Sequence, residues 1–122
     1  MPTRYWLLPL FALALLAFPA HGRAQADAEQ FVVTYVEFLP ADKDRGGELV
    51  EQLAALGRRN GAVSFTANEE IQRPNFFALL EIWNNAAARQ AFENLPQIQA
   101  LLAQITALLE EPLDVRPGTL IE

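Results

Sequence analysis

The chain has no cysteine, one histidine and one methionine among its 122 residues. The histidine is His21 and the methionine is Met1, so both lie near the N-terminus. The absence of cysteine excludes a structural disulfide and a cysteine-linked lipid anchor. Beyond His21 the chain also lacks histidine and cysteine zinc ligands, the usual axial haem ligands apart from tyrosine, and histidine-assisted nucleophiles. We therefore expect no metal and no cofactor, and chemistry limited to carboxylates, tyrosine, tryptophan, asparagine, arginine or backbone groups.

Basic residues are also scarce, with nine Lys and Arg against 15 Asp and Glu. Arg58-Arg59 is the only basic cluster that stands out. Because contacts to phosphate dominate the affinity of proteins for nucleic acid, we expect no nucleic-acid partner.

The N-terminal segment has the parts of a secretory signal peptide. Arg4 precedes a 13-residue apolar run at residues 6–18, and Ala24-Gln25-Ala26 is a small-residue cleavage pattern. An uncleaved membrane anchor is the alternative, but a spanning helix needs about 20 apolar residues. We expect cleavage after Ala26 and a periplasmic or secreted protein without membrane attachment. The remaining residues 27–122 would form one small domain with a net charge of −8.

Apolar periodicity and turn residues divide this domain into seven segments. Strands are predicted at residues 31–38, 62–71, 75–83 and 113–121. Helices are predicted at residues 44–60, 86–94 and from 96 to about 109. Gly46-Gly47 weakens the start of the first helix, and Asn84 or Asn85 caps the second. The order β-α-β-β-α-α-β predicts an α+β fold of the ferredoxin-like, split βαβ type, with its helices on one face of the sheet.

The third strand is apolar on both sides. One side carries Phe76, Ala78, Leu80 and Ile82, and the other carries Phe77, Leu79, Glu81 and Trp83. Since the helices can cover only one face of the sheet, the simplest cover for the other is a second copy of the chain in a two-fold homodimer. The alternative is a monomer whose long loops cover that face.

Glu81 is the one charge in this run, and two interpretations remain open. It can be a structural carboxylate paired with Arg116 or Arg73. It can instead face a cavity and exchange protons with a bound molecule.

Other candidate site residues also have a structural alternative. Tyr35 can orient a substrate or pack as a barrel aromatic, and Trp83 can stack on a ligand or belong to the core. Asn75 can donate to an oxyanion or simply follow Pro74 in a turn. The phenylalanines expected in a pocket wall or in the core are Phe65, Phe77 and Phe92.

The segment Arg73-Pro74-Asn75-Phe76-Phe77, then Glu81-Ile82-Trp83 and an alanine-rich short helix, resembles the antibiotic biosynthesis monooxygenase domain family. The resemblance covers residues 31–116 and extends to small quinol monooxygenases. It implies a dimeric α+β barrel and cofactor-free oxygenation of phenolic or quinol-type substrates. One difference is Phe92, where the family often has a histidine, so a histidine-dependent mechanism and haem degradation are not expected.

These observations predict an exported, homodimeric, cofactor-independent monooxygenase that oxidises a small aromatic or quinol-type molecule with dioxygen. Glu81 or Tyr35 would handle protons, Asn75 would stabilise charge, and Trp83 would line the pocket. Its other lining residues would be Phe65, Phe77 and Phe92. The alternative is a non-catalytic dimeric barrel that binds a small hydrophobic ligand.

Overall fold

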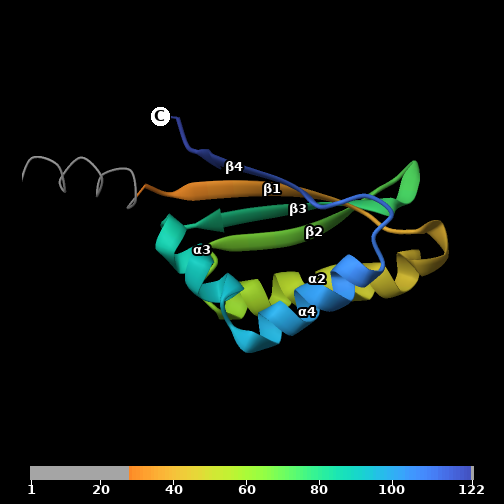
Figure 1. Ribbon diagram of the computed structural model, residues 1–122. Coiled ribbons are helices and arrows are strands. Elements are labelled where there is room, and N and C mark those ends of the chain that lie inside the picture. The colour runs from red at the N-terminus through yellow and green to blue at the C-terminus, as the bar shows by residue number, and fades with distance from the viewer. Residues whose placement is uncertain (1–27, 122) are drawn as a thin grey trace, which may run out of the picture.

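The computed structural model of the chain describes residues 28–121 (Figure 1). The predicted signal peptide, residues 1–26, lies outside the described residues. The strands are β1 (Gln30–Glu37), β2 (Ser64–Glu70), β3 (Arg73–Trp83) and β4 (Asp114–Thr119). The helices are the 3-10 helix η1 (Pro40–Asp42), α2 (Lys43–Arg59), α3 (Ala86–Glu93) and α4 (Pro96–Ala107). Each predicted strand and helix is present, with ends that differ by a few residues.

The four strands form one antiparallel sheet in the order β2-β3-β1-β4. All three α-helices lie against the same face of this sheet (Figure 1). This arrangement confirms the predicted α+β, ferredoxin-like fold. β4 is an edge strand, as Pro117-Gly118 indicated, because proline has no N–H to donate to a neighbouring strand.

The core lies between the sheet and the helices. Strands β1 and β3 supply alternate residues to it, and α2 and α4 supply one apolar stripe each. Its largest fully buried side chains are Trp83, Phe38, Phe65, Leu49, Ile98 and Ile105. Burial of each large apolar side chain stabilises the fold by about 1.5–3 kcal/mol, so this layer accounts for most of the driving force.

Two glycines let α2 lie close to aromatic rings of the core. A Cβ atom on Gly46 would stand 2.4 Å from the Phe38 ring, and one on Gly57 would stand 2.3 Å from the Phe65 ring. Tight packing of the two rings against α2 offsets the low helix propensity of the glycines. The helix accordingly begins at Lys43, before Gly46.

The other face of the sheet is apolar, and no helix of residues 28–121 lies over it. It carries alternate residues of the central strands, namely Phe31, Val33, Tyr35, Phe76, Ala78, Leu80 and Ile82. Leu80 is 44% exposed, and the others are half-buried. Within one chain, therefore, only the helix-covered face of β3 is buried, and the outer face is the one for which a partner copy was predicted.

Candidate functional site

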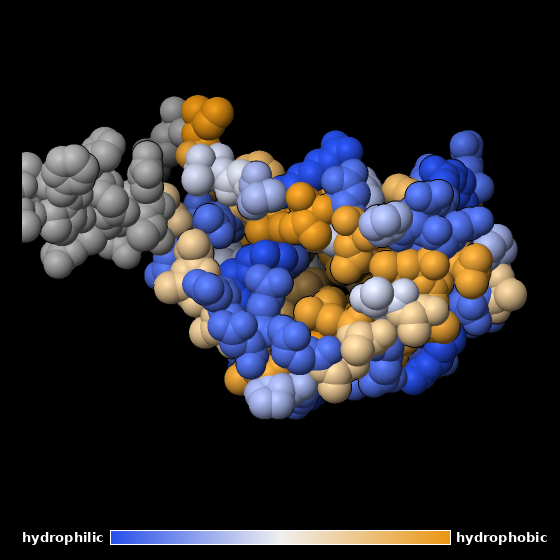
Figure 2. All heavy atoms as spheres, viewed as in Figure 1, coloured by the Kyte–Doolittle hydropathy of each residue, from blue (hydrophilic) through white to orange (hydrophobic). Residues whose placement is uncertain are grey.

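A cavity of about 100 Å³ lies between the sheet and the helices. Figure 2 shows a hollow with hydrophobic residues inside it between the strands and the helices. The polar lining residues are Thr34, Glu81, Arg89 and Glu93. The apolar lining residues are Val36, Leu53, Leu79, Leu102, Ile105, Leu113 and Val115. Glu93 and Val115 are partly exposed and mark the open side, whereas Thr34 and Glu81 are both 4% exposed and lie at the closed side.

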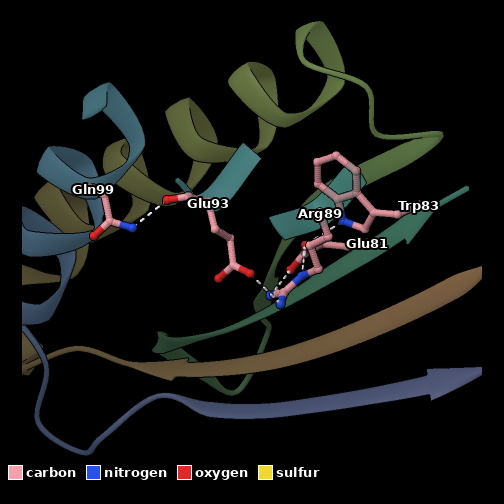
Figure 3. A network of polar contacts seen from close by, with 5 residues as sticks. All are labelled: Glu81, Trp83, Arg89, Glu93 and Gln99. Carbon is pink, nitrogen blue, oxygen red and sulfur yellow. Dashed lines mark hydrogen bonds and ion pairs between the residues drawn. The ribbon is translucent and has the colours of Figure 1, made fainter. Parts of the chain in front are cut away.

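Glu81 is a buried carboxylate held by two side chains (Figure 3). Its Oε1 accepts hydrogen bonds from Trp83 Nε1 at 2.8 Å and from Arg89 Nε at 3.0 Å. Its Oε2 has one longer contact, 3.4 Å from Arg89 Nη2. Because that length exceeds the usual range for N–H···O bonds, Oε2 retains capacity to accept another hydrogen bond.

The partner of Glu81 is Arg89, and the prediction of Arg116 or Arg73 was wrong. Arg116 pairs with Asp114 and lies 5.0 Å from the ring centroid of Tyr35. Arg73 pairs with Glu37, on the outer side of the sheet. The two arginines therefore belong to the outer face, while Glu81 belongs to the inner one. Glu81 pairs with an arginine and also lines a cavity, so the pairing does not exclude a position at a cavity.

Helix α3 positions Arg89. Asn85 caps this helix, with its side-chain oxygen 2.8 Å from Ala88 N, as the sequence predicted. One helical turn later Arg89 reaches back over β3 to Glu81, and its Nη1 contacts Glu93 Oε1 at 2.9 Å. Two carboxylates thus share one guanidinium, which gives the group a formal charge of −1.

An aromatic cluster supports the closed end of this site. Trp83 is fully buried, and its ring centroid lies 5.3 Å from that of Phe92 and 6.5 Å from that of Phe65. Phe65 and Phe92 also line a small hollow of about 30 Å³ beside Glu81. Burial of the Trp83 ring fixes the direction of its N–H, which in turn holds the Glu81 carboxylate in place.

The structure separates three predicted site residues from this group. Tyr35 lies on the outer face of the sheet, with its ring tilted against that of Phe76 and the two ring centroids 5.8 Å apart. Asn75 donates from its side chain to the backbone oxygen of Phe38, 2.9 Å away, at the far end of β3. Phe77 packs edge-on against Phe38, also at that end.

Sequence reasoning missed three polar residues of the site, Thr34, Arg89 and Glu93. Thr34 alternates with Tyr35 on β1, and its neighbours Val32 and Val36 are buried on the inner face. A hydroxyl between two buried valines was the available signal. Arg89 is the only basic residue of α3, and a helix that follows β3 directly can place it near Glu81.

The outer face has two wider grooves, one on each side of the Tyr35–Phe76 pair. Their volumes are about 380 and 390 Å³, larger than the inner cavity. Most of their polar residues are exposed, and two of them, Arg116 and Asp114, form a surface ion pair. The adjacent guanidinium of Arg116 lowers the pKa of the Asp114 carboxyl, chiefly through their hydrogen bond. We assign the candidate site to the inner cavity because the buried charged group of Glu81 faces enclosed apolar space there.

Residues 28–121 contain no group of three or more His, Cys, Asp or Glu placed to hold a metal ion. Nor does a helix in that part of the chain have the length and apolarity required to cross a membrane.

Solved structures share this fold. A candidate antibiotic biosynthesis monooxygenase from Caulobacter crescentus matches with a TM-score of 0.74 at 15% sequence identity, covering 84% of this chain and 99% of that one. Another from Nitrosomonas europaea matches with a TM-score of 0.71 at 13% identity, over 76% of this chain and 90% of that one. A conserved protein of unknown function from Bacteroides thetaiotaomicron, described as a possible oxidoreductase, matches with a TM-score of 0.72 at 19% identity. The match covers 78% of this chain and 100% of that one. The sequence itself matches no family model and no curated protein. The chain therefore has the fold of structures named antibiotic biosynthesis monooxygenases, as its resemblance to that family predicted.

Proposed function

We propose that this protein is a cofactor-independent monooxygenase-like enzyme that oxidises a small aromatic hydroxy compound with dioxygen in the inner cavity. The observation that supports this most strongly is the Glu81 carboxylate, which is 4% exposed, lines apolar space and keeps hydrogen-bonding capacity on Oε2. A buried carboxylate beside an apolar pocket is suited to accept the proton of a phenolic hydroxyl.

In the proposed reaction the substrate supplies all the electrons. A quinol transfers one hydroxyl proton to Glu81 and becomes an electron-rich anion that reduces dioxygen. Over the whole reaction the substrate loses four electrons and two hydrogen atoms and gains one oxygen atom, which yields a hydroxyquinone. The second oxygen atom takes the two hydrogens and leaves as water, and Glu81 returns its proton in that step.

Arg89 and Trp83 have distinct parts in this proposal. Trp83 Nε1 and Arg89 Nε both hold Oε1 of Glu81, so the carboxylate is fixed before the substrate enters. The Arg89 guanidinium also lines the cavity, where it can stabilise negative charge that develops on the substrate oxygen. Asn75, whose amide is bonded to the backbone at the other end of β3, has no part in it.

Oxygen consumption by metal-free protein with a panel of quinols tests the proposal. We expect uptake that depends on the quinol and falls at least 100-fold in Glu81→Gln, since general acid–base groups contribute about 10²–10⁴-fold. Glu110→Gln, the same change at an exposed position outside the cavity, is the matched control and should retain full activity. With ¹⁸O₂, one labelled atom should enter the product. Equal rates in Glu81→Gln and the parent would refute the role of Glu81.

A non-catalytic ligand-binding barrel is the second candidate. Phe92 favours it, because this ring fills the space beside Trp83 and Phe65 at a position where the resembling family often has histidine. Tight binding of an apolar ligand with no oxygen uptake for any quinol would select this alternative.

We also propose that a second copy covers the outer face of the sheet. The apolar residues of β1 and β3 there are half-buried or exposed in one chain, and monomers rarely leave such a surface open. Leu80→Lys would place a charge at the middle of this face and should convert a dimer to a monomer on size-exclusion chromatography. Ile71→Lys, at a position 98% exposed, is the control that should leave the dimer intact. A parent protein that elutes as a monomer at micromolar concentration would refute the dimer.

Export to the periplasm or the medium completes the proposal, on the basis of the N-terminal sequence pattern. N-terminal sequencing of the protein recovered from the expressing cell should begin at Asp27. Recovery of Met1 on the membrane-bound protein would instead identify an anchor.

A further inference from the structure

We propose that the inner cavity selects neutral, single-ring phenols, with Glu81 accepting from one hydroxyl and Thr34 recognising a second polar group on the ring. The inference deepens the proposed function, since it rests on the use of this cavity as the substrate site. Nothing in the likeness to other proteins specifies the size, the charge or the second contact of the ligand. All three follow from the geometry of the cavity.

The volume of the cavity limits the ligand to one ring. About 100 Å³ is available, whereas a buried apolar cavity of about 150 Å³ accepts benzene. A single ring fits this cavity if one edge of the ring lies in the open side, beside Val115. A fused two-ring compound does not fit, because Leu53, Leu102 and Ile105 close the cavity from the helix side.

The charge of the site selects a neutral ligand that donates a hydrogen bond. Among the described residues that line the cavity, two carboxylates, Glu81 and Glu93, stand against one cation, Arg89. Both Glu81 and Glu93 already accept from this guanidinium, so an anionic ligand would compete with them for it and add like charge to a poorly solvated space. A neutral hydroxyl can donate to Oε2 of Glu81 without displacing either bond.

The register of the sheet explains the role of Thr34. Thr34 pairs with Leu79, and Glu81 is the next residue of β3 whose side chain points inward. Thr34 and Glu81 are therefore diagonal neighbours on adjacent strands, about 7–8 Å apart between Cα atoms. A ring that lies over both side chains, in the cavity, can direct one hydroxyl toward each, as a 1,4-diol does. Val36 and Leu79 beside Thr34 offer no other polar group.

Binding, rather than turnover, tests this inference. The isolated protein, labelled on its threonine and leucine methyl groups, would be titrated with phenol, hydroquinone, benzoate and 1-naphthol and followed by NMR. We expect shifts at Thr34, Leu79 and Leu102 with the two single-ring phenols. Hydroquinone should bind about three- to tenfold more tightly than phenol, the effect of one net hydrogen bond. Benzoate and naphthol should each bind at least tenfold more weakly than phenol.

Two variants separate the contribution of the Thr34 hydroxyl from that of the cavity size. Thr34→Val removes the hydroxyl at nearly constant volume and should abolish the preference for hydroquinone while leaving the affinity for phenol unchanged. Leu102→Ala should enlarge the cavity and admit naphthol, whereas Leu108→Ala, on α4's C-terminal side and outside the cavity lining, should not.

Each outcome tests a separate part of the inference: the size limit, the charge argument or the role of Thr34. Equal binding of naphthol and phenol by the parent protein would overturn the size limit, and equal binding of benzoate would overturn the charge argument. A hydroquinone preference that persists in Thr34→Val would overturn the role of Thr34. Phenol binding without oxygen uptake would refute the proposed oxygenation and leave this site intact. Turnover of quinols without any chemical-shift change at Thr34 or Leu79 would refute the inner cavity as the substrate site, while the oxygenase activity itself would stand.

Discussion

Replacement of Arg89 by methionine tests whether the buried Glu81 depends on its partner. Arg89→Met keeps most of the side-chain volume but leaves the Glu81 carboxylate with Trp83 Nε1 as its one remaining hydrogen-bond partner. Removal of one member of a buried ion pair costs about 3–5 kcal/mol, because the remaining charge is uncompensated. Since Arg89 is 19% exposed and water can partly replace it, we expect a loss of about 3 kcal/mol in the free energy of unfolding.

The double variant Glu81→Gln/Arg89→Met separates loss of contacts from stranded charge. In it no buried charge remains, while the glutamine oxygen can still accept from Trp83. We therefore expect the double variant to be more stable than Arg89→Met alone, by about 1 kcal/mol or more. Glu81→Gln alone should cost about 1–2 kcal/mol, since it weakens charged hydrogen bonds but leaves Arg89 paired with Glu93.

Urea unfolding at pH 7, at one fixed protein concentration, measures these differences. With a slope of about 1.5 kcal/mol per molar urea, a loss of 3 kcal/mol lowers the midpoint by about 2 M. If the double variant is as unstable as Arg89→Met or less stable, the destabilisation does not come from an uncompensated carboxylate, and the role assigned to Arg89 is wrong.

Three further predictions concern packing, capping and surface charge. Gly57→Ala should destabilise the fold by about 1–3 kcal/mol in urea unfolding, because its Cβ would lie 2.3 Å from the Phe65 ring. Asn85→Ala should cost about 1 kcal/mol and speed amide hydrogen exchange in α3, because it removes the cap of that helix. The pKa of Asp114 is held below its usual value by Arg116, so this carboxylate favours the folded chain at neutral pH and the contribution is lost as acid protonates it. Arg116→Gln should raise the pKa of Asp114 toward the usual value in an NMR titration.

Matched positions control these predictions. Gly47→Ala changes the same helix, but its Cβ would be 3.3 Å from its nearest neighbour, so we expect a change within about 1 kcal/mol. Asn84→Ala lies one residue before the cap and should leave α3 unchanged. Equal effects at Gly47 and Gly57, or at Asn84 and Asn85, would contradict the packing and capping arguments. An unchanged Asp114 titration in Arg116→Gln would show that the ion pair does not form in solution.

The fold was predictable because its signals are local. Alternating residues, the turn before Pro74 and the asparagine caps each determine a short segment, and the order of segments leaves few topologies. The inner face of β1 was harder to predict, because Phe31 to Phe38 is apolar on both sides and a shift of one residue exchanges Thr34 with Tyr35. Tyr35 was therefore predicted as a site residue, although it lies on the outer face.

The partner of Glu81 was not predictable to the same degree. The sequence analysis proposed Arg73 and Arg116, whereas the observed partner, Arg89, depends on how α3 turns back over β3 after Trp83. The cavity was also beyond prediction, since its volume is the small space that remains after many side chains have packed. Its residues come from β1, β3, β4 and all three α-helices or the segments that join them, and no local pattern marks them as neighbours.

Gly46 and Gly57 are 11 residues apart on α2, about three helical turns, so both face the sheet about 16 Å apart along the helix axis. At each of them an aromatic ring stands directly against the helix backbone, and the two rings act as spacers that set the separation of the helical and sheet layers. The height of the enclosed space is thus fixed by two contacts outside its lining. Substitution of Gly46 or Gly57 should therefore alter which molecules enter the cavity, although neither glycine contacts a bound molecule.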